Sequence, residues 1–173
     1  MSFVQAKPIA THNFYGPIHK GLRLRLSQLL VQIGACDGDD REALAQLMAD
    51  LRVQCHISEH HLSNEDVWIH PALEKRAPGS TVRLARDHEH HRRTFEEIEE
   101  LIGRVETADD AERGAWLRAL YLRFSTFVAE DFAHMAEEEQ LILPILQSLF
   151  TDEELIGIED KIMSGLSPDQ MIA

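Results

Sequence analysis

The 173-residue chain is poor in cysteine, in aromatic residues and in positive charge. Its two cysteines, Cys36 and Cys55, cannot build a disulfide framework, and nothing in the sequence requires an oxidising compartment. Only 17 Lys and Arg stand against 30 Asp and Glu, which gives a net charge of −13. Nucleic acids and anionic membranes both reward basic residues, so we expect neither as a partner, while a protein partner stays open.

Long apolar runs are absent as well. The longest apolar stretch, Leu141 to Leu146, is far too short to span a bilayer and contains Pro144. The opening MSFVQAKPIATHN lacks the charged-then-apolar layout of a secretory signal. The length suits one domain with a sizeable core. We therefore expect a single acidic, cytoplasmic domain over residues 1–173.

The apolar residues recur every three or four positions, and no stretch with a period of two is long enough for a strand. Clusters of glycine and proline divide this pattern into helical lengths. The predicted helices cover residues 14–34, 40–70, 80–106 and 109–148, and a fifth begins at Thr151, which has capping-box spacing with Glu154. Because the connections are short, the sequence predicts an all-α, antiparallel up-down-up-down four-helix bundle over about 12–148, with a C-terminal extension over 150–173.

An internal repeat is the most informative feature of the sequence. A shift of 73 positions places His61, Glu65 and Asp66 on His134, Glu138 and Glu139. The first and third predicted helices repeat at a shift of 69, which places His19 on His88. The chain therefore consists of two helical hairpins of one design.

The chain has ten histidines, and one in each predicted helix borders the apolar stripe at 100° per residue. In the second and fourth helices a glutamate follows the histidine by one turn and falls inside the stripe. Several imidazoles and two carboxylates in one core would cost several kcal/mol per unpaired charge unless a cation neutralised them. The pattern thus predicts a metal site among the six inward residues His19, His61, Glu65, His88, His134 and Glu138.

The motif His-x3-Glu-acid-x5-Pro-x-Leu, found twice, resembles that of the hemerythrin-like (HHE cation-binding) domain family. The resemblance covers about residues 12–148. It implies a four-helix bundle with two non-haem irons, bridged by carboxylates and an oxo or hydroxo group, that is, a centre of Fe-O-Fe type. By position, Glu65 and Glu138 would be the bridges and the four histidines would complete the two coordination shells. Imidazole and carboxylate ligands suit iron or manganese, and zinc or copper could also occupy the site.

The sequence differs from the oxygen-carrying members of that family in the third helix, where they have a His-x3-His pair and this chain has Arg92. His91, which also lies inward, could be a fifth ligand or a second-shell donor. The acids one position further on, Asp66 and Glu139, could ligate instead of the glutamates, although they lie about 140° from their histidines on a regular helix. The pattern is most similar to that of the four-histidine, two-glutamate members, which include iron-sulfur-repair and sensor proteins.

Other candidates have simpler interpretations. The string His56-Ile-Ser-Glu59-His60 spells an inverted zinc-protease motif, but both histidines should lie on the solvated face. Tyr15 and Asp131 face inward near the proposed site, either as second-shell groups or as simple packing. The remaining histidines should be surface residues: His12, His70 and His90.

We expect a non-haem di-iron protein that binds or senses a small ligand, namely oxygen, nitric oxide, peroxide or iron itself, rather than an enzyme. One alternative is a di-iron enzyme that reduces peroxide or nitric oxide, or a protein that donates iron for the repair of iron-sulfur clusters. Another is an interaction module in which the metal is structural. No Gly-rich phosphate loop follows a strand, so hydride and group-transfer chemistry have no support.

Overall fold

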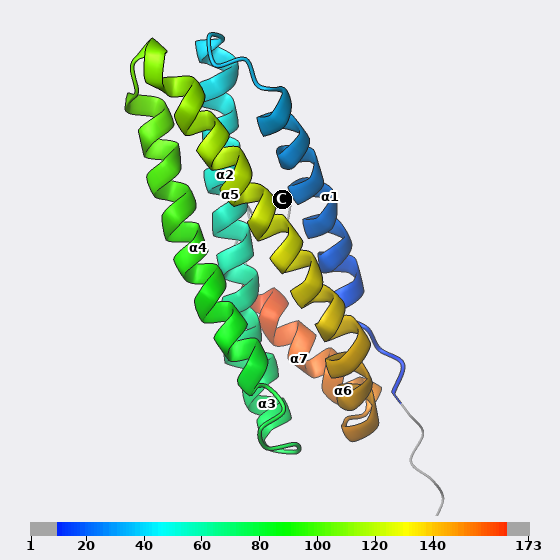
Figure 1. Cartoon of the computed structure of the whole chain (residues 1–173). Coiled ribbons are helices and arrows are strands. Elements are labelled where there is room, and N and C mark those ends of the chain that lie inside the picture. The colour runs from blue at the N-terminus through cyan, green and yellow to red at the C-terminus, as the bar shows by residue number, and fades with distance from the viewer. Residues whose placement is uncertain (1–9, 166–173) are drawn as a thin grey trace, which may run out of the picture.

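A computed structural model describes residues 10–165 of the chain, and the described residues form helices without any strand (Figure 1). The long helices are α1 (Tyr15–Ala35), α2 (Arg41–Asn64), α4 (Val82–Thr107) and α5 (Asp110–Glu137). The shorter helical segments are η1 (Glu65–Ile69), α3 (His70–Glu74), η2 (Glu138–Ile142), α6 (Leu143–Leu149) and α7 (Asp152–Ser164). None of the helices in this part of the chain is both long and apolar enough to cross a membrane.

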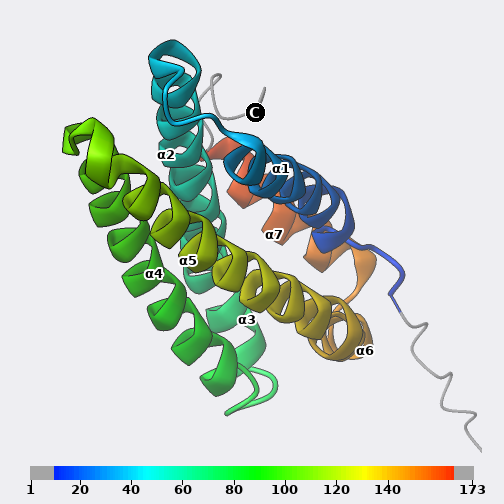
Figure 2. The ribbon, with the colours of Figure 1, turned by 45° about the horizontal axis from the view of Figure 1, so that its top comes forward.

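The four long helices form a closed ring in which α1 packs on α2 and α5, and α4 packs on the same two helices. Short turns join α1 to α2 and α4 to α5 at one end of the bundle, so neighbouring helices run antiparallel (Figure 1). The last helix, α7, returns along the outside of the bundle and packs against η1 (Figure 2). The predicted all-α bundle with a short C-terminal helix is therefore confirmed.

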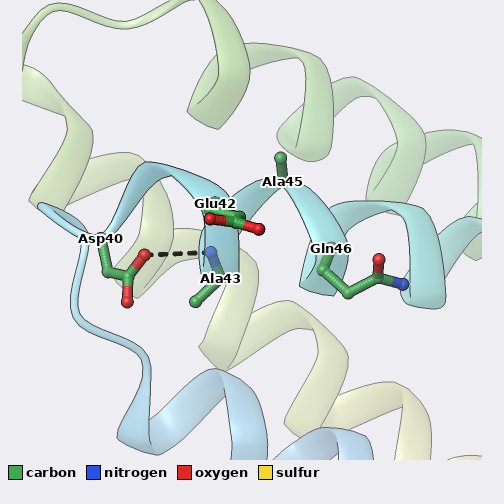
Figure 3. A pocket seen from close by; sticks show the side chains of 5 residues that line it. All are labelled: Asp40, Glu42, Ala43, Ala45 and Gln46. Atoms are coloured by element: carbon green, nitrogen blue, oxygen red, sulfur yellow. Dashed lines mark hydrogen bonds between the residues drawn. The ribbon is translucent and has the colours of Figure 1, made fainter.

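Side-chain caps define where three of the helices begin. The Asp40 carboxylate accepts a hydrogen bond from the Ala43 amide at 3.0 Å at the start of α2 (Figure 3). Asp109 caps α5 in the same way. At the start of α7, Thr151 and Glu154 form the predicted capping box. Each cap satisfies backbone amides that have no partner within the helix.

A π-helical segment of five residues, η1, connects α2 to α3, and a second one, η2, connects α5 to α6. The chain therefore stays helical across both junctions. The His70 amide donates to the Glu65 carbonyl, and the Leu143 amide donates to the Glu138 carbonyl, in the wider i to i−5 pattern. Pro71 and Pro144 follow directly. A proline ring inside a regular helix clashes with the carbonyl four residues earlier, and the wider turn relieves that clash. The second predicted helix therefore runs past residue 70 to Glu74.

The buried apolar residues form two clusters that occupy different lengths of the bundle. The larger cluster draws on α1 from Leu22 onward, on the first half of α2, on the second half of α4 and on most of α5. The smaller cluster includes Phe14, Leu84 and Leu146, and it receives the inner face of α7. The histidines and glutamates of the predicted site lie between these two clusters, except that Met135 of the larger cluster follows His134 on α5. The bundle therefore has one polar layer enclosed by two apolar ones.

Candidate metal centre

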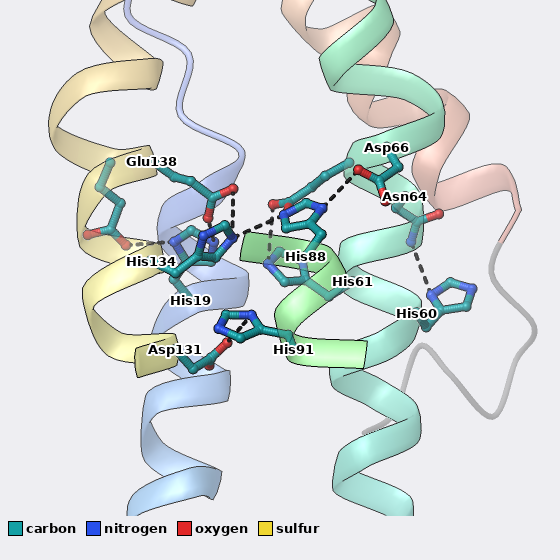
Figure 4. A network of polar contacts seen from close by, with 12 residues as sticks. His19, His60, His61, Asn64, Asp66, His88, His91, Asp131, His134 and Glu138 are labelled. Carbon is teal, nitrogen blue, oxygen red and sulfur yellow. Dashed lines mark hydrogen bonds and ion pairs between the residues drawn. The ribbon is translucent and has the colours of Figure 1, made fainter. Parts of the chain in front are cut away.

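The six predicted ligand residues converge in this polar layer. Figure 4 shows five of them pointing toward one another: His19, His61, His88, His134 and Glu138. His19 comes from α1, His88 from α4, and His61 and His134 from the ends of α2 and α5. Glu65 and Glu138 begin the two π segments. Five of the six residues are buried, and the His61 side chain keeps 12% of its surface exposed. Local helical phase therefore brings together residues that are up to 119 positions apart in the sequence.

The donor atoms divide into two groups that share both glutamates. His19, His61, Glu65 and Glu138 each place one donor atom within 4.8 Å of the others. His88 and His134 form a second group with Glu65 and Glu138, and its donor atoms also lie within 4.8 Å of one another. This sharing is the arrangement in which two carboxylates would bridge a pair of metal ions.

Each glutamate directs one oxygen to each group. Glu65 lies 3.2 Å from His61 Nε2 through Oε1 and 3.4 Å from His88 Nε2 through Oε2. Glu138 lies 3.4 Å from His19 Nε2 through Oε2 and 3.5 Å from His134 Nε2 through Oε1. Two donors at right angles around a metal, each bound at about 2.1 Å, are separated by about 3 Å, so the observed spacings suit a shared metal shell.

The two acids one position further on have a different role from the glutamates. Asp66 Oδ1 lies 2.8 Å from His88 Nδ1, and Glu139 Oε1 lies 2.9 Å from His19 Nδ1. A carboxylate at Nδ1 holds the proton there and leaves the Nε2 lone pair directed at the centre. Each acid thus orients the histidine of the opposite hairpin.

Hydrogen bonds from histidines and arginines keep both of these acids ionised. Burial opposes ionisation of Asp66, but hydrogen bonds from His70, His88 and Arg92 hold its pKa below the ordinary value. The pKa of Glu139 is likewise lowered despite partial burial, by hydrogen bonds from Arg23 and His19. The orienting acids are therefore charged at neutral pH.

The two central glutamates, Glu65 and Glu138, have raised rather than lowered pKa values. Burial, followed by mutual repulsion, raises the pKa of Glu138 well above its ordinary value, and burial also raises that of Glu65. Apart from the other glutamate, no described residue donates a hydrogen bond to either carboxylate. Burial lowers the pKa of His19 to about 4 and that of His134 to about 2, so these imidazoles are neutral. Orphaned acceptors beside neutral imidazoles fit metal ions, which would satisfy them directly.

Comparison with known protein families agrees with this geometry. The model of the hemerythrin HHE cation-binding domain family matches residues 17–146, which is most of the chain. The chain belongs to this family. Comparison with curated protein sequences gives no significant match.

Three further predicted residues surround the cluster of this hemerythrin-family domain without joining either donor group. The Tyr15 ring stacks on His19 with centroids 5.1 Å apart. The His91 ring meets the His134 ring edge-on at 5.2 Å, and its Nδ1 lies 3.8 Å from Asp131 Oδ1, too far for a hydrogen bond. The structure thus places His91 behind a histidine of the cluster rather than among the donor atoms, and Asp131 is buried beside it.

The histidines that were predicted to be solvated are only partly so. His56 and His90 are exposed, and His60 is half-buried and bonded to Asn64. The surface prediction for His70 is wrong. His70 is buried, its Nδ1 lies 3.1 Å from Asp66 Oδ1, and its ring stacks on His88 at 5.0 Å. The physical reason is the π segment, which delays the following residues around the helix axis and turns His70 inward.

Sequence reasoning missed the role of Asp66 and Glu139 because a regular helix directs them away from the centre. The signal was present in the proline that follows each motif at a fixed spacing, Pro71 and Pro144. A proline inside a helical pattern predicts a local change in the hydrogen-bond ladder. With the wider turn, two consecutive acids can both face the interior.

Proposed function

We propose that this domain is a non-haem di-iron protein that binds or senses a small ligand such as oxygen, nitric oxide or peroxide. The observation that carries the proposal is the pair of donor groups that share Glu65 and Glu138. Family membership supports the cation-binding part. Two bound irons would supply a redox-active pair, and six protein ligands would leave coordination positions for exogenous ligands.

The protein residues have distinct tasks in this proposal. The four histidines hold the metals through Nε2, and the glutamates neutralise their charge and link the two groups. Asp66 and Glu139 hold a proton at Nδ1 of His88 and His19 and thereby keep these rings in position. The two apolar clusters above and below the layer separate its two ends from solvent.

The first test is the number of metals. Because the donor groups share both bridges, iron-reconstituted protein should hold close to two irons per chain after desalting. Plasma emission spectrometry measures the ratio of iron to protein. One iron or none would contradict the di-iron proposal. The same preparation, offered manganese and zinc in competition, would identify the preferred metal.

The second test separates the inward histidines from their neighbours on the same helix. His61→Ala and His134→Ala should each lower the iron content, since each removes a donor that faces a buried carboxylate. The matched control is His56→Ala combined with His60→Ala, on the face of α2 away from the cluster, which should leave the iron content unchanged. The reverse result would overturn the ligand assignment.

Mixing the reduced protein with oxygen, nitric oxide and peroxide separates binding from catalysis. A spectral change that stays stoichiometric supports a binding or sensing role. Continued consumption of the ligand in the presence of a reductant would instead favour the enzymatic alternative.

A further inference from the structure

A pocket of about 380 Å³ lies between α1, α2 and α7, beside the cluster. Its walls are mainly apolar and include Ile18, Ile57, Ile162 and Met163. At the inner end it reaches residues of the first donor group or in contact with it: Tyr15, His61 and Glu65. On α2, His61 turns into the cluster and its neighbour His60 turns away from it (Figure 4). The pocket therefore connects the polar layer with the outside along one hairpin.

The internal repeat shows that two positions lining this pocket differ in the second hairpin. The pocket residues Phe14 and Asn64 correspond to Arg83 and Glu137 of the second hairpin. There, Arg83 Nη2 and Glu137 Oε2 form an ion pair at 2.8 Å that joins α4 to α5. The two hairpins share one design for the donor atoms and differ in what lies outside them.

The pocket is far larger than oxygen, nitric oxide or peroxide would require. A water molecule takes about 30 Å³ in the liquid, and a diatomic ligand needs little more. A volume of about 380 Å³ lies within the range of ~300–1,000 Å³ for sites that bind organic molecules. Most organic sites combine apolar walls with a few polar groups that fix orientation, and this pocket does the same.

The charges around the pocket indicate a neutral occupant. None of the described residues that line it is a lysine or an arginine. The rim carboxylate of Glu159 is already paired with His12, at 2.7 Å between Oε2 and Nε2. An anion would meet no fixed positive charge, and a cation would compete with an existing ion pair.

Besides the proposed metal ligands His61 and Glu65, the Tyr15 hydroxyl at the inner end also lacks a partner. The Tyr15 side chain is 1% exposed, and its hydroxyl has no hydrogen-bond partner among the described residues. A buried hydroxyl without a partner costs free energy that a ligand oxygen could recover.

We propose that this pocket binds a neutral, mainly apolar organic molecule whose hydroxyl or carbonyl oxygen pairs with the Tyr15 hydroxyl. This goes beyond the proposed function, since binding in the pocket requires no metal. An occupant would lie against His61 and Glu65 and would cover the first donor group from the solvent side. A second hollow, at Asp40 to Gln46, has five exposed lining residues and no convergent polar groups, so it offers no comparable site (Figure 3).

The experiment uses 1-naphthol as the probe and naphthalene as the probe without a hydroxyl. Both are titrated by fluorescence into chelated and iron-loaded full-length protein, and circular dichroism verifies the fold of each variant. Wild-type protein should bind 1-naphthol saturably with one site in both forms. Met163→Trp, which fills the pocket from α7, should weaken binding at least tenfold.

Two controls locate the site and the hydrogen bond. Ile156→Trp lies on the same helix, outside the pocket and with similar exposure, 42% against 47% for Met163, so it should leave binding unchanged. Tyr15→Phe should weaken 1-naphthol about fivefold, the loss of one neutral hydrogen bond, and leave naphthalene unchanged.

Each opposite result overturns a defined part of the proposal. Absence of saturable binding, or equal binding by wild type and Met163→Trp, would exclude the pocket as the site. Equal binding of 1-naphthol by wild type and Tyr15→Phe would exclude the hydrogen bond. Because the chelated protein is tested as well, failure of the metal proposal would leave this result intact.

Discussion

Chelated protein that carries Glu65→Gln together with Glu138→Gln is expected to melt at a higher temperature than chelated wild type, and to bind no iron. Without metal, the two buried carboxyls can form a hydrogen bond only with each other among the described residues, and burial raises both pKa values well above the ordinary value. Folding at pH 8 must then either bury charge or take up protons from solution. Amides avoid both costs. A gain of about 2 kcal/mol corresponds to about 4–8 °C in a domain of this size.

The advantage of the double variant should grow with pH. In the unfolded chain the glutamates lose their protons above about pH 4.3, whereas the folded state retains them, so wild-type stability falls as the pH rises from there toward the raised pKa values. The histidines destabilise the fold at low pH instead. With the pKa of His19 lowered to about 4 and that of His134 to about 2, the unfolded chain takes up more protons below about pH 6.5, and stability falls as the pH drops through that range. The two glutamine substitutions remove only the loss of stability that occurs as the pH rises.

Calorimetry at pH 5 and pH 8 in the presence of a chelator would measure this difference. Glu137→Gln is the matched control, because Glu137 precedes Glu138 in the chain and is paired with Arg83. It should not raise the melting temperature at either pH. A double variant that melts below the chelated wild type at pH 8 would mean that the central carboxylates are stabilised by something other than a metal.

Much of the fold and of the candidate site was predictable because it depends on local periodicity. The apolar spacing of each segment determines which face of a helix is buried, and that face carries His19 or His88 in one helix of each hairpin. The fold was confirmed, and the structure brings all six predicted ligand residues together. Their binding of metal stays a prediction.

Features that depend on tertiary packing could not be derived in the same way. The pocket exists because α7 packs against η1 across the end of α2, and no local pattern predicts where a C-terminal helix will pack. The burial of His70 follows from a π turn that a constant angle of 100° per residue cannot represent. The same assumption led to the view that Asp66 points away from the centre.

Removal of an orienting acid is expected to weaken one metal more than the other. Asp66 contacts His88, whose Nε2 faces the second donor group, whereas Glu139 contacts His19 in the first. Asp66→Ala should therefore weaken the metal at His88 and His134, and Glu139→Ala the metal at His19 and His61. Loss of a carboxylate behind a ligating histidine typically costs 10- to 100-fold in affinity.

Titration of iron(II) against a competing chelator should resolve this as a change from two similar binding steps to one tight and one weak step. Asp66→Asn keeps an acceptor oxygen at His88 Nδ1 and should recover most of the affinity, whereas Asp66→Leu, which fills a similar volume without an acceptor, should not. Glu130→Ala is the control, because it removes a carboxylate from a histidine outside the cluster, His90, at 3.2 Å. It should leave both steps unchanged. If Asp66→Ala bound both irons as tightly as the control, the two acids would serve the packing of the π segments and not the orientation of the histidines.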